Sequence, residues 1–285
     1  MSIADLRRSY HRQICERILY VDNGIPNFAD SSSEASIAIS AQVVSQLSYP
    51  LSRERISGQT AGSRFEQVTR EFLQSAFTLL QHIRPGKWSF SIETSPGRQR
   101  KVSRKSIAEF EQYEHLATLQ RTLTEHPELK AALGGDYLIT PDILVGRYPL
   151  LDDELNSDTI IVAKDEPFCQ LTPLRAVNRP QSCLILHASI SCKWTMRSDR
   201  AQNIRTEALN LIRNRKGHTP HIAAVTAEPL PSRLASLALG TGDLDCVYHF
   251  ALHELRMAVE KTGSSSDKEL LLAMIEGRRL RDISD

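Results

Sequence analysis

Short apolar runs alternate with amphipathic segments through the second half of the chain, and this alternation constrains the fold more than any other feature. Runs of strand length that are apolar throughout are typical of buried strands, and apolar residues at helical spacing are typical of surface helices. The predicted strands are residues 137–145, 184–193 and 221–227, and the predicted helices are residues 200–213, 232–239 and 250–261. The pattern predicts an α/β fold with a central mixed β-sheet flanked by helices.

The first half of the chain is mainly helical, and one segment fits neither helix nor strand. Helices are predicted over residues 2–18, 32–47, 63–83 and 106–125, and a strand over residues 88–92. Residues 146–181 are acidic, contain prolines and lack periodicity, so they are interpreted as a loop-rich insertion with a short strand at 159–162. We expect a single domain over residues 1–285, with an N-terminal helical segment (1–57) and a core (58–285).

Composition permits a sizeable core and excludes several classes of protein. Of 285 residues, 41% are hydrophobic, which is enough for one large domain. The five cysteines are scattered and form no C-x-x-C pair, which argues against a zinc site and suits a reducing cytoplasm. No segment has the length and apolarity of a membrane span, so we expect a cytoplasmic protein with no membrane partner.

Overall charge does not single out a nucleic-acid partner, because 35 Lys and Arg against 34 Asp and Glu leave a formal net charge of +1. Basic residues are nevertheless concentrated locally. One run is Arg98, Arg100, Lys101, Arg104 and Lys105, and a second is Arg197, Arg200, Arg205, Arg213, Arg215 and Lys216. Such runs are usually solvated faces, so by themselves they only permit DNA binding.

Two short motifs indicate phosphodiester chemistry. Asp142 follows Pro141 within one predicted strand, and Lys193 ends another in the sequence Ser191-Cys192-Lys193. Hydrolysis of a phosphodiester needs carboxylates that hold hard cations and a lysine that orients the attacking water. In PD-(D/E)-x-K nucleases these groups lie on adjacent strands.

The acid of that motif is missing here, because Ser191 stands two residues before Lys193. We expect Glu207, on the following helix, to supply the missing carboxylate, and Glu66 is a further candidate. Each motif is short and common, so a structural interpretation stays open at this point. In that interpretation Asp142 caps a turn, while Lys193 and Glu207 are surface charges.

A compact set of base-reading side chains follows Lys193. Arg197, Asp199 and Arg200 stand together at the predicted start of a helix. Arginine reads the O6 and N7 atoms of guanine with two hydrogen bonds, and aspartate accepts from N4 of cytosine. From a helix N-terminus such side chains can enter the major groove together, which favours recognition of G·C pairs in double-stranded DNA.

Six stretches of the sequence resemble the NgoMIV-type restriction endonucleases. They are GQTAGSRFE (58–66), ITPDI (139–143), LHASISCKWTMRSDRAQN (186–203), RNRKG (213–217), VTAEPLPSR (225–233) and LGTGDLDCVYHFAL (239–252). The resemblance runs from about Arg55 to Asp285 and is thinner before it, where Asn27-Phe28-Ala29-Asp30 is similar to the family's N-terminal DNA-reading segment.

The resemblance implies a restriction-endonuclease-like core and a type II enzyme that cuts double-stranded DNA at GCCGGC after the first G, leaving four-base 5′ overhangs. It implies Mg²⁺, two ions per active site, a homotetramer built from two dimers, and a cognate DNA methyltransferase that acts on the same site. The implied catalytic residues are Glu66, Asp142, Ser191, Lys193 and Glu207, and the implied metal ligands are Asp142, the main-chain carbonyl of Cys192, Glu207 and Glu66. The implied base readers are Arg197, Asp199 and Arg200 for the central CCGG, Asp30 and Arg233 for the outer pair, and Gln59 in the minor groove.

Two alternatives remain at this point. A nuclease of the same core without restriction specificity would share Asp142, Lys193 and Glu207 but would not need the readers. A DNA-binding module with a decayed catalytic centre is suggested by the serine at position 191.

Overall fold

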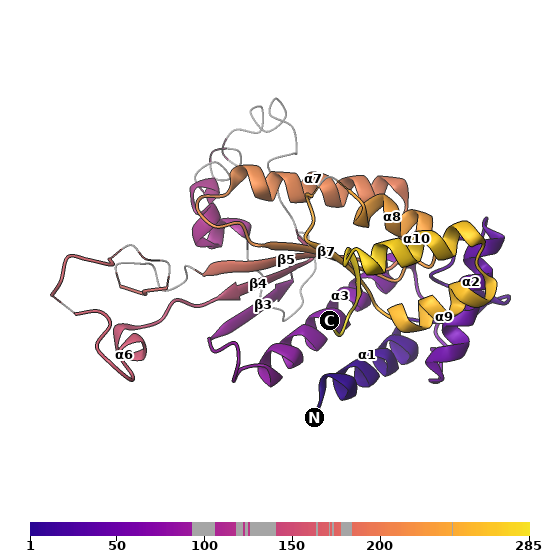
Figure 1. The fold of residues 1–285 in the computed structure, drawn as a ribbon, viewed down its shortest axis with the longest axis horizontal. Helices are drawn as coiled ribbons and strands as arrows, with labels where there is room; N and C mark the ends of the chain where they lie inside the picture. Colours follow the sequence, from indigo (N-terminus) through magenta and orange to yellow (C-terminus); the bar gives the residue numbers. More distant parts are fainter. Residues whose placement is uncertain are drawn as a thin grey trace.

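A six-stranded mixed sheet forms the centre of the protein in the computed structural model (Figure 1). Its strands, in spatial order, are β3 (Trp88–Ile92), β4 (Ile143–Arg147), β5 (Ile185–Lys193), β6 (His221–Thr226), β7 (Cys246–His249) and β8 (Leu280–Asp282). β4 pairs antiparallel with β3 and β5, whereas β5 to β8 pair in parallel. The structure describes residues 1–92, 106–117, 122, 125, 141–163, 165–170, 172, 174–177, 184–240 and 242–285.

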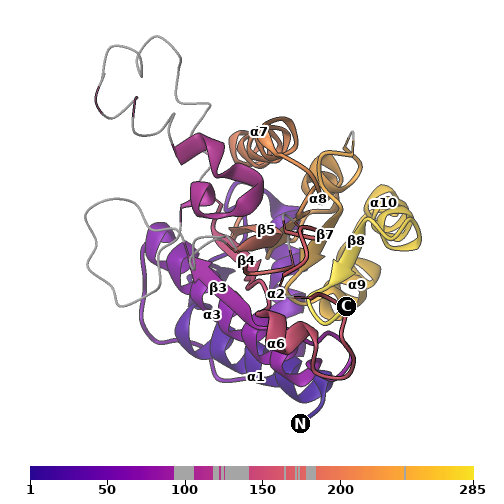
Figure 2. The same ribbon diagram turned by 90° about the vertical axis from the view of Figure 1, so that its left-hand side faces the viewer.

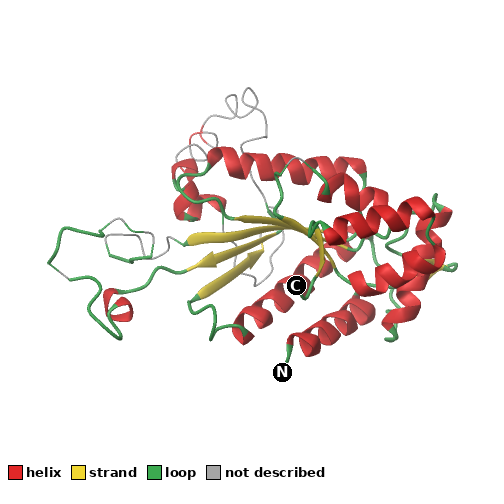
Figure 3. Ribbon diagram, viewed as in Figure 1, coloured by secondary structure: helices red, strands yellow, loops and turns green. Residues whose placement is uncertain are grey.

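Helices cover both faces of the sheet. They are α1 (Ile3–Arg17), α2 (Glu34–Leu47), α3 (Gly58–Leu79), α6 (Asp152–Leu155), α7 (Ser198–Asn214), α8 (Pro231–Ala238), α9 (Leu252–Thr262) and α10 (Ser265–Glu276). Helices α7 and α8 lie over one face, and α1 and α3 lie over the other (Figures 1 and 3). The view turned by 90° shows the same separation, with the sheet seen nearly end-on between the two helical layers (Figure 2).

This cover explains the apolar composition of the inner strands. Ile143, Leu144 and Val145 of β4 are each at most 1% exposed, so both faces of that strand are buried. Parallel strands need crossover connections, and helices supply them here: α7 connects β5 to β6, and α8 connects β6 to β7. Within the described residues, no helix is long and apolar enough to cross a membrane.

The predicted fold class is confirmed, and most predicted helices and strands appear with shifted ends. Helix α3 begins at Gly58 rather than near residue 63, because the hydroxyl of Ser57 accepts a hydrogen bond from the Thr60 N–H and caps the helix earlier. The strand predicted for residues 137–145 corresponds to β4, which covers Ile143–Arg147. Residues 137–140 of the prediction lie outside the described residues. The basic run at residues 98–105 also lies outside them.

One predicted helix begins later than expected, and one predicted strand is wrong. The helix predicted over residues 106–125 is preceded by two short 3-10 helices, Ile107–Glu109 and Glu111–Tyr113, and α-helical geometry begins only at His115. Phe110 between them has an extended backbone and forms an isolated β-bridge with Leu184, which interrupts helical geometry. No strand forms at residues 159–162, because the side chain of Asn156 bonds the backbone of Ile161 and Val162 instead.

The segment between β4 and β5 extends beyond the end of the sheet as an arm (Figure 1). Its fold is held by Arg175, which is 1% exposed and donates from Nε and Nη2 to the two carboxylate oxygens of Asp152 at 2.7 and 2.6 Å. An isolated β-bridge between Leu150 and Arg175 joins the two sides of the arm. The predicted loop-rich insertion therefore has one helical turn, α6, and an internal ion pair.

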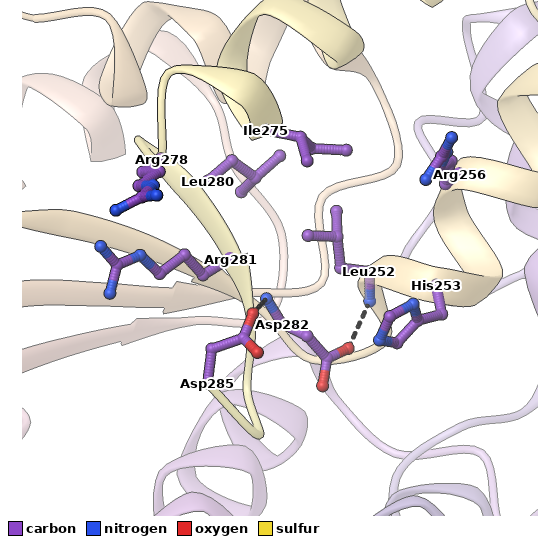
Figure 4. A pocket seen from close by; sticks show the side chains of 9 residues that line it. All are labelled: Leu252, His253, Arg256, Ile275, Arg278, Leu280, Arg281, Asp282 and Asp285. Atoms are coloured by element: carbon purple, nitrogen blue, oxygen red, sulfur yellow. Dashed lines mark hydrogen bonds between the residues drawn. The ribbon is translucent and has the colours of Figure 1, made fainter.

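A buried ion-pair network ties the two ends of the chain together. Arg7 of α1 donates two hydrogen bonds to Glu254 of α9, at 3.0 and 2.6 Å, and two to Asp282 of β8, both at 2.8 Å. Asp282 is 1% exposed and also accepts from the N–H of Leu252 at 3.0 Å, as Figure 4 shows. Burial alone would raise the pKa of Asp282, but the hydrogen bonds from Arg7 and Ser284 hold that pKa well below its usual value.

Replacing Arg7 by methionine should destabilise the protein strongly. The substitution leaves the buried Asp282 carboxylate without its main partner, a loss of about 3–5 kcal/mol at neutral pH. Because the pKa of Asp282 is depressed on folding, its contribution to stability is present above its unfolded pKa of about 4 and is lost as the pH falls through the folded value. The difference between wild type and Arg7→Met should therefore shrink below about pH 4, measured by urea unfolding at several pH values. Arg8→Met is the matched control, because Arg8 pairs with Asp5 on the exposed side of α1, and a similar loss there would contradict the role assigned to Arg7.

Candidate active site

The register of β4 and β5 brings Asp142 and Lys193 together at one end of the sheet. Asp142 immediately precedes β4, and Lys193 is the last residue of β5. The pairing of Ile143 with Ile190 places Asp142 opposite the end of β5. The Nζ atom of Lys193 donates to Oδ2 of Asp142 at 2.7 Å, and the N–H of Cys192 donates to the same oxygen at 2.6 Å. The two motifs that the sequence singled out therefore form one site.

Glu207 reaches this site from the helix above. The hydroxyl of Ser191 donates to Oε2 of Glu207 at 3.3 Å. Alternate residues of a strand share a face, so Ser191 and Lys193 both point towards α7, where Glu207 lies. A carboxylate thus stands beside the serine that replaces the acid of the usual motif.

Cys192 contributes its backbone to the site rather than its thiol. Its side chain lies on the opposite face of β5, where it interacts with Thr69 of α3. The N–H and C=O of one strand residue point to the same side of the strand, so the Cys192 carbonyl faces the edge that carries Asp142. Burial raises the pKa of the Cys192 thiol well above its usual value, which excludes it as a ready nucleophile.

Acidic groups outnumber the single lysine in this half-buried site. Burial raises the pKa of Glu66 to about 7, and the charge of Asp142 adds to the shift. Burial also raises the pKa of Glu207 to about 7, even though Lys193 opposes the shift. Burial acts to lower the pKa of Lys193, but the charge and hydrogen bond of Asp142 outweigh it and the net shift is upward. Three carboxylates around one ammonium make a site with an excess of negative charge.

This donor set fits a hard divalent cation. Mg²⁺ prefers carboxylate and carbonyl oxygens and keeps several of its waters, so it needs few ligands from the protein. Among the described residues, no three His, Cys, Asp or Glu side chains already converge as a preformed metal cluster. The residues available are Asp142, Glu66 and Glu207, with the carbonyl of Cys192, and a cation among them would offset the charge that burial penalises.

The candidate readers of the central bases lie at the start of α7. Arg197 is the N-cap residue of this helix, and Asp199 lies in its first turn. Both side chains are exposed. Arg200 is half-buried, and its Nη1 donates to the carbonyl and hydroxyl oxygens of Thr195 at 2.9 and 2.6 Å. The readers therefore begin four residues after Lys193, on a helix end that faces solvent.

The two candidate readers of the outer pair, 203 residues apart in sequence, are in direct contact. Nη2 of Arg233, on α8, donates to Oδ2 of Asp30. Asp30 also accepts from the N–H and hydroxyl of Ser32, while Ser33 is the cap of α2, so Asp30 is not needed for helix capping. Gln59 is exposed in the first turn of α3. The structure thus places Asp30 and Arg233 in hydrogen-bonding contact.

Comparison with known proteins agrees with this geometry. The family model described as NgoMIV restriction enzyme matches residues 10–285. The chain is also 48% identical over 281 residues to the type II restriction enzyme NgoMIV of Neisseria gonorrhoeae, covering 98% of this chain and 95% of that protein.

The chain belongs to the NgoMIV restriction enzyme family. The predicted family and the predicted class of enzyme, a type II site-specific deoxyribonuclease, are confirmed. Membership also weakens the alternative of a nuclease without restriction specificity. The roles of individual residues in this family member stay predictions.

One buried acid beside the readers was missed by the sequence analysis. Glu228 is 1% exposed and accepts from the N–H groups of Met196 and Leu230 at 3.0 and 3.2 Å. A signal was present, since Glu228 follows the buried strand β6 and precedes Pro229. An acid in such a position is either solvated or fully bonded, and sequence alone does not distinguish the two.

A cavity of about 380 Å³ lies elsewhere, between α9, α10 and β8 (Figure 4). Arg256, Arg278 and Arg281 line it together with Asp282 and Asp285. None of its lining residues belongs to the catalytic or reading sets of this family member. The two aspartates already have other partners: Asp282 pairs with Arg7, and Asp285 accepts from the N–H of Asp282 at 3.0 Å.

Replacing Glu207 by glutamine should abolish DNA cleavage, because the site then loses the carboxylate that contacts Ser191. Adding Ser191→Glu should restore part of the activity, since an acid then stands on β5 itself. Asp142→Asn is the control: it should be equally inactive, and Ser191→Glu should not rescue it, because Asp142 anchors Lys193. Single-turnover cleavage of a short duplex measures all four proteins. Near-normal cleavage by Glu207→Gln would show that the acid of the motif is not displaced to α7.

Proposed function

We propose that the protein cuts double-stranded DNA at GCCGGC, after the first G, to leave four-base 5′ overhangs. The observation that carries the proposal is the pair of Asp142 and Lys193, hydrogen-bonded at 2.7 Å, with the proposed readers of α7 beginning four residues after Lys193. The proposed catalytic lysine and the proposed central readers thus lie in one short stretch of chain. Membership of the NgoMIV family supports the same assignment.

The proposed chemistry uses Mg²⁺, with two ions per active site held by Asp142, Glu66, Glu207 and the carbonyl of Cys192. Bound Mg²⁺ would supply a Lewis acid that lowers the pKa of a water and stabilises charge on the phosphate oxygens. Lys193, fixed by its hydrogen bond to Asp142, orients the attacking water and favours its deprotonated form. The hydroxyl of Ser191 holds the carboxylate of Glu207 in place.

The proposed readers have the donors and acceptors that G·C pairs require. Arg197 and Arg200 would donate to O6 and N7 of guanine, and Asp199 would accept from N4 of cytosine in the central CCGG. Asp30 and Arg233 would make the same two kinds of contact to the outer pair, which explains why they lie side by side. Gln59 would contact the minor groove from the start of α3.

Plasmid DNA with known GCCGGC sites tests the proposal. Incubation with Mg²⁺ should give discrete fragments whose ends carry a 5′ CCGG overhang, and a plasmid with ACCGGT in their place should stay intact. Uniform degradation would favour an unspecific nuclease of the same core. A shifted but uncut plasmid would favour a DNA-binding module with a decayed centre, so either result would overturn the proposal.

We further propose that the working form is a homotetramer of two dimers and that the arm between β4 and β5 contributes to its interface. Large apolar side chains are exposed along this arm, among them Ile160 at 82%, Phe168 at 69% and Ile161 at 65%. Exposed apolar clusters on a projecting segment are typical of protein–protein contacts. The arm also projects from the body of the chain, where a second copy can reach it (Figure 1).

Replacing Ile160 and Phe168 by serine should therefore lower the mass in solution from four chains to two. It should also slow cleavage of a plasmid with two sites towards the rate of a one-site plasmid, because paired sites no longer bind one assembly. Light scattering coupled to size exclusion, with cleavage kinetics, measures both effects. Met257→Ser, which alters an exposed apolar residue of α9, should change neither. A tetramer that survives in the double variant would remove the arm from the interface.

A further inference from the structure

Glu228 is a buried acid that the proposed metal centre does not use. It lies between β6 and α8, and its own N–H donates to Oγ1 of Thr226 at 3.1 Å. Its Oε2 accepts from the N–H of Met196 at 3.0 Å, and its Oε1 accepts from the N–H of Leu230 at 3.2 Å. The carboxylate therefore bonds two segments at once, the one before α7 and the one before α8.

Each of these segments carries a proposed reader. Met196 immediately precedes Arg197, and Leu230 is the N-cap residue of α8, which carries Arg233 in its first turn. The carbonyl of Met196 accepts from Nη1 of Arg233 at 3.2 Å. The N–H of Met196 is thus bonded to Glu228, and its carbonyl is bonded to Arg233. These bonds link the start of α7, which carries the proposed central readers, to Arg233, the proposed reader of the outer pair.

Glu228 also supplies negative charge beside Arg233. Its Oε2 lies 3.8 Å from Nη1 of Arg233, whose side chain is only 31% exposed. Arg233 has a second carboxylate partner, Asp30. If Asp30 accepts from a cytosine N4, as proposed above, the base and Arg233 would share that carboxylate, and Glu228 would still balance the charge of Arg233.

We infer that Glu228 is a positioning residue that joins the two base-reading segments into one rigid unit and thereby sets discrimination at the outer base pair. The inference rests on the proposed function, because it assumes that Arg233 reads a base. Glu228 itself lies 1% exposed beneath the readers, so it acts through Arg233 and Met196 and does not touch DNA. A simple packing role would not need an acid here, since burying a carboxylate is costly unless its bonds are specific.

The test compares cleavage of GCCGGC and ACCGGT duplexes in one mixture, as the ratio of kcat/KM for the two sites. Glu228→Gln keeps the size of the side chain but leaves one acceptor oxygen and no charge, so it frees either Met196 or Leu230. We expect this ratio to fall about tenfold or more, because a misplaced Arg233 reads the outer base pair less well. The ratio should fall by a larger factor than the single-turnover rate on saturating GCCGGC. Asp243→Asn is the matched control, because Asp243 is also buried and lies 3.9 Å from Arg205 of α7, but it bonds neither Met196 nor Leu230, so both bonds of Glu228 stay intact.

A second variant covers the case in which Glu228→Gln does not fold. Thr226→Val keeps the shape of the side chain but removes the acceptor for the Glu228 N–H, so it should lower the ratio in the same direction by a smaller factor. Thermal melting of each variant identifies the folded ones. If wild type itself does not discriminate between the two sites, the proposed function fails. If wild type discriminates and the folded variants at positions 228 and 226 keep its ratio, even with weaker binding overall, the role of Glu228 is wrong.

Discussion

The carboxylate of Asp142 is the point on which the candidate site depends. One oxygen accepts both from the Cys192 N–H and from Lys193 Nζ, at 2.6 and 2.7 Å, and so joins the start of β4 to the end of β5. This contact exists only in one register, because a slip by one residue would turn every side chain of a strand to the other face. The buried residues of β4 exclude such a slip, so packing of the sheet fixes the geometry of the catalytic pair.

The same site carries an electrostatic cost. Burial raises the pKa of Glu66 and of Glu207 to about 7, and in both cases the charge of Asp142 works in the same direction. A chain selected for stability alone would place apolar residues there, since unpaired buried charge is unfavourable. The ion-pair network of Arg7, Glu254 and Asp282 differs from the candidate site in its charge balance. There Arg7 makes two hydrogen bonds to each acid and offsets their buried negative charge. Excess negative charge at the end of the sheet therefore indicates a site that is completed by a cation.

Sequence reasoning could bring Asp142 and Lys193 together and name the candidate central readers because each group lies within one short motif, at the end of a strand or the start of a helix. It missed Glu228 because its partners, Met196 and Leu230, are set by tertiary contacts that no local pattern shows. The union of Asp30 and Arg233 was expected only from family resemblance, since 203 residues separate them. The late start of the helix predicted from residue 106 has the same cause: Phe110 pairs with Leu184, and this tertiary contact overrides a favourable local capping sequence.

A buried aromatic cluster connects the segments that carry the candidate base readers with the candidate active site. Trp194 follows Lys193 directly, and its ring lies 5.3 Å from that of Phe65, which precedes Glu66, and 5.7 Å from that of Phe28, two residues before Asp30. All three aromatic side chains are at most 4% exposed. Because interiors pack densely and yield little, the segments that carry Lys193, Glu66 and Asp30 cannot move independently. The chain between Lys193 and the start of α7 is thus held at two points, at Trp194 by this cluster and at Met196 by the hydrogen bond to Glu228. The candidate lysine and the candidate readers of α7 therefore have a fixed spacing in the fold.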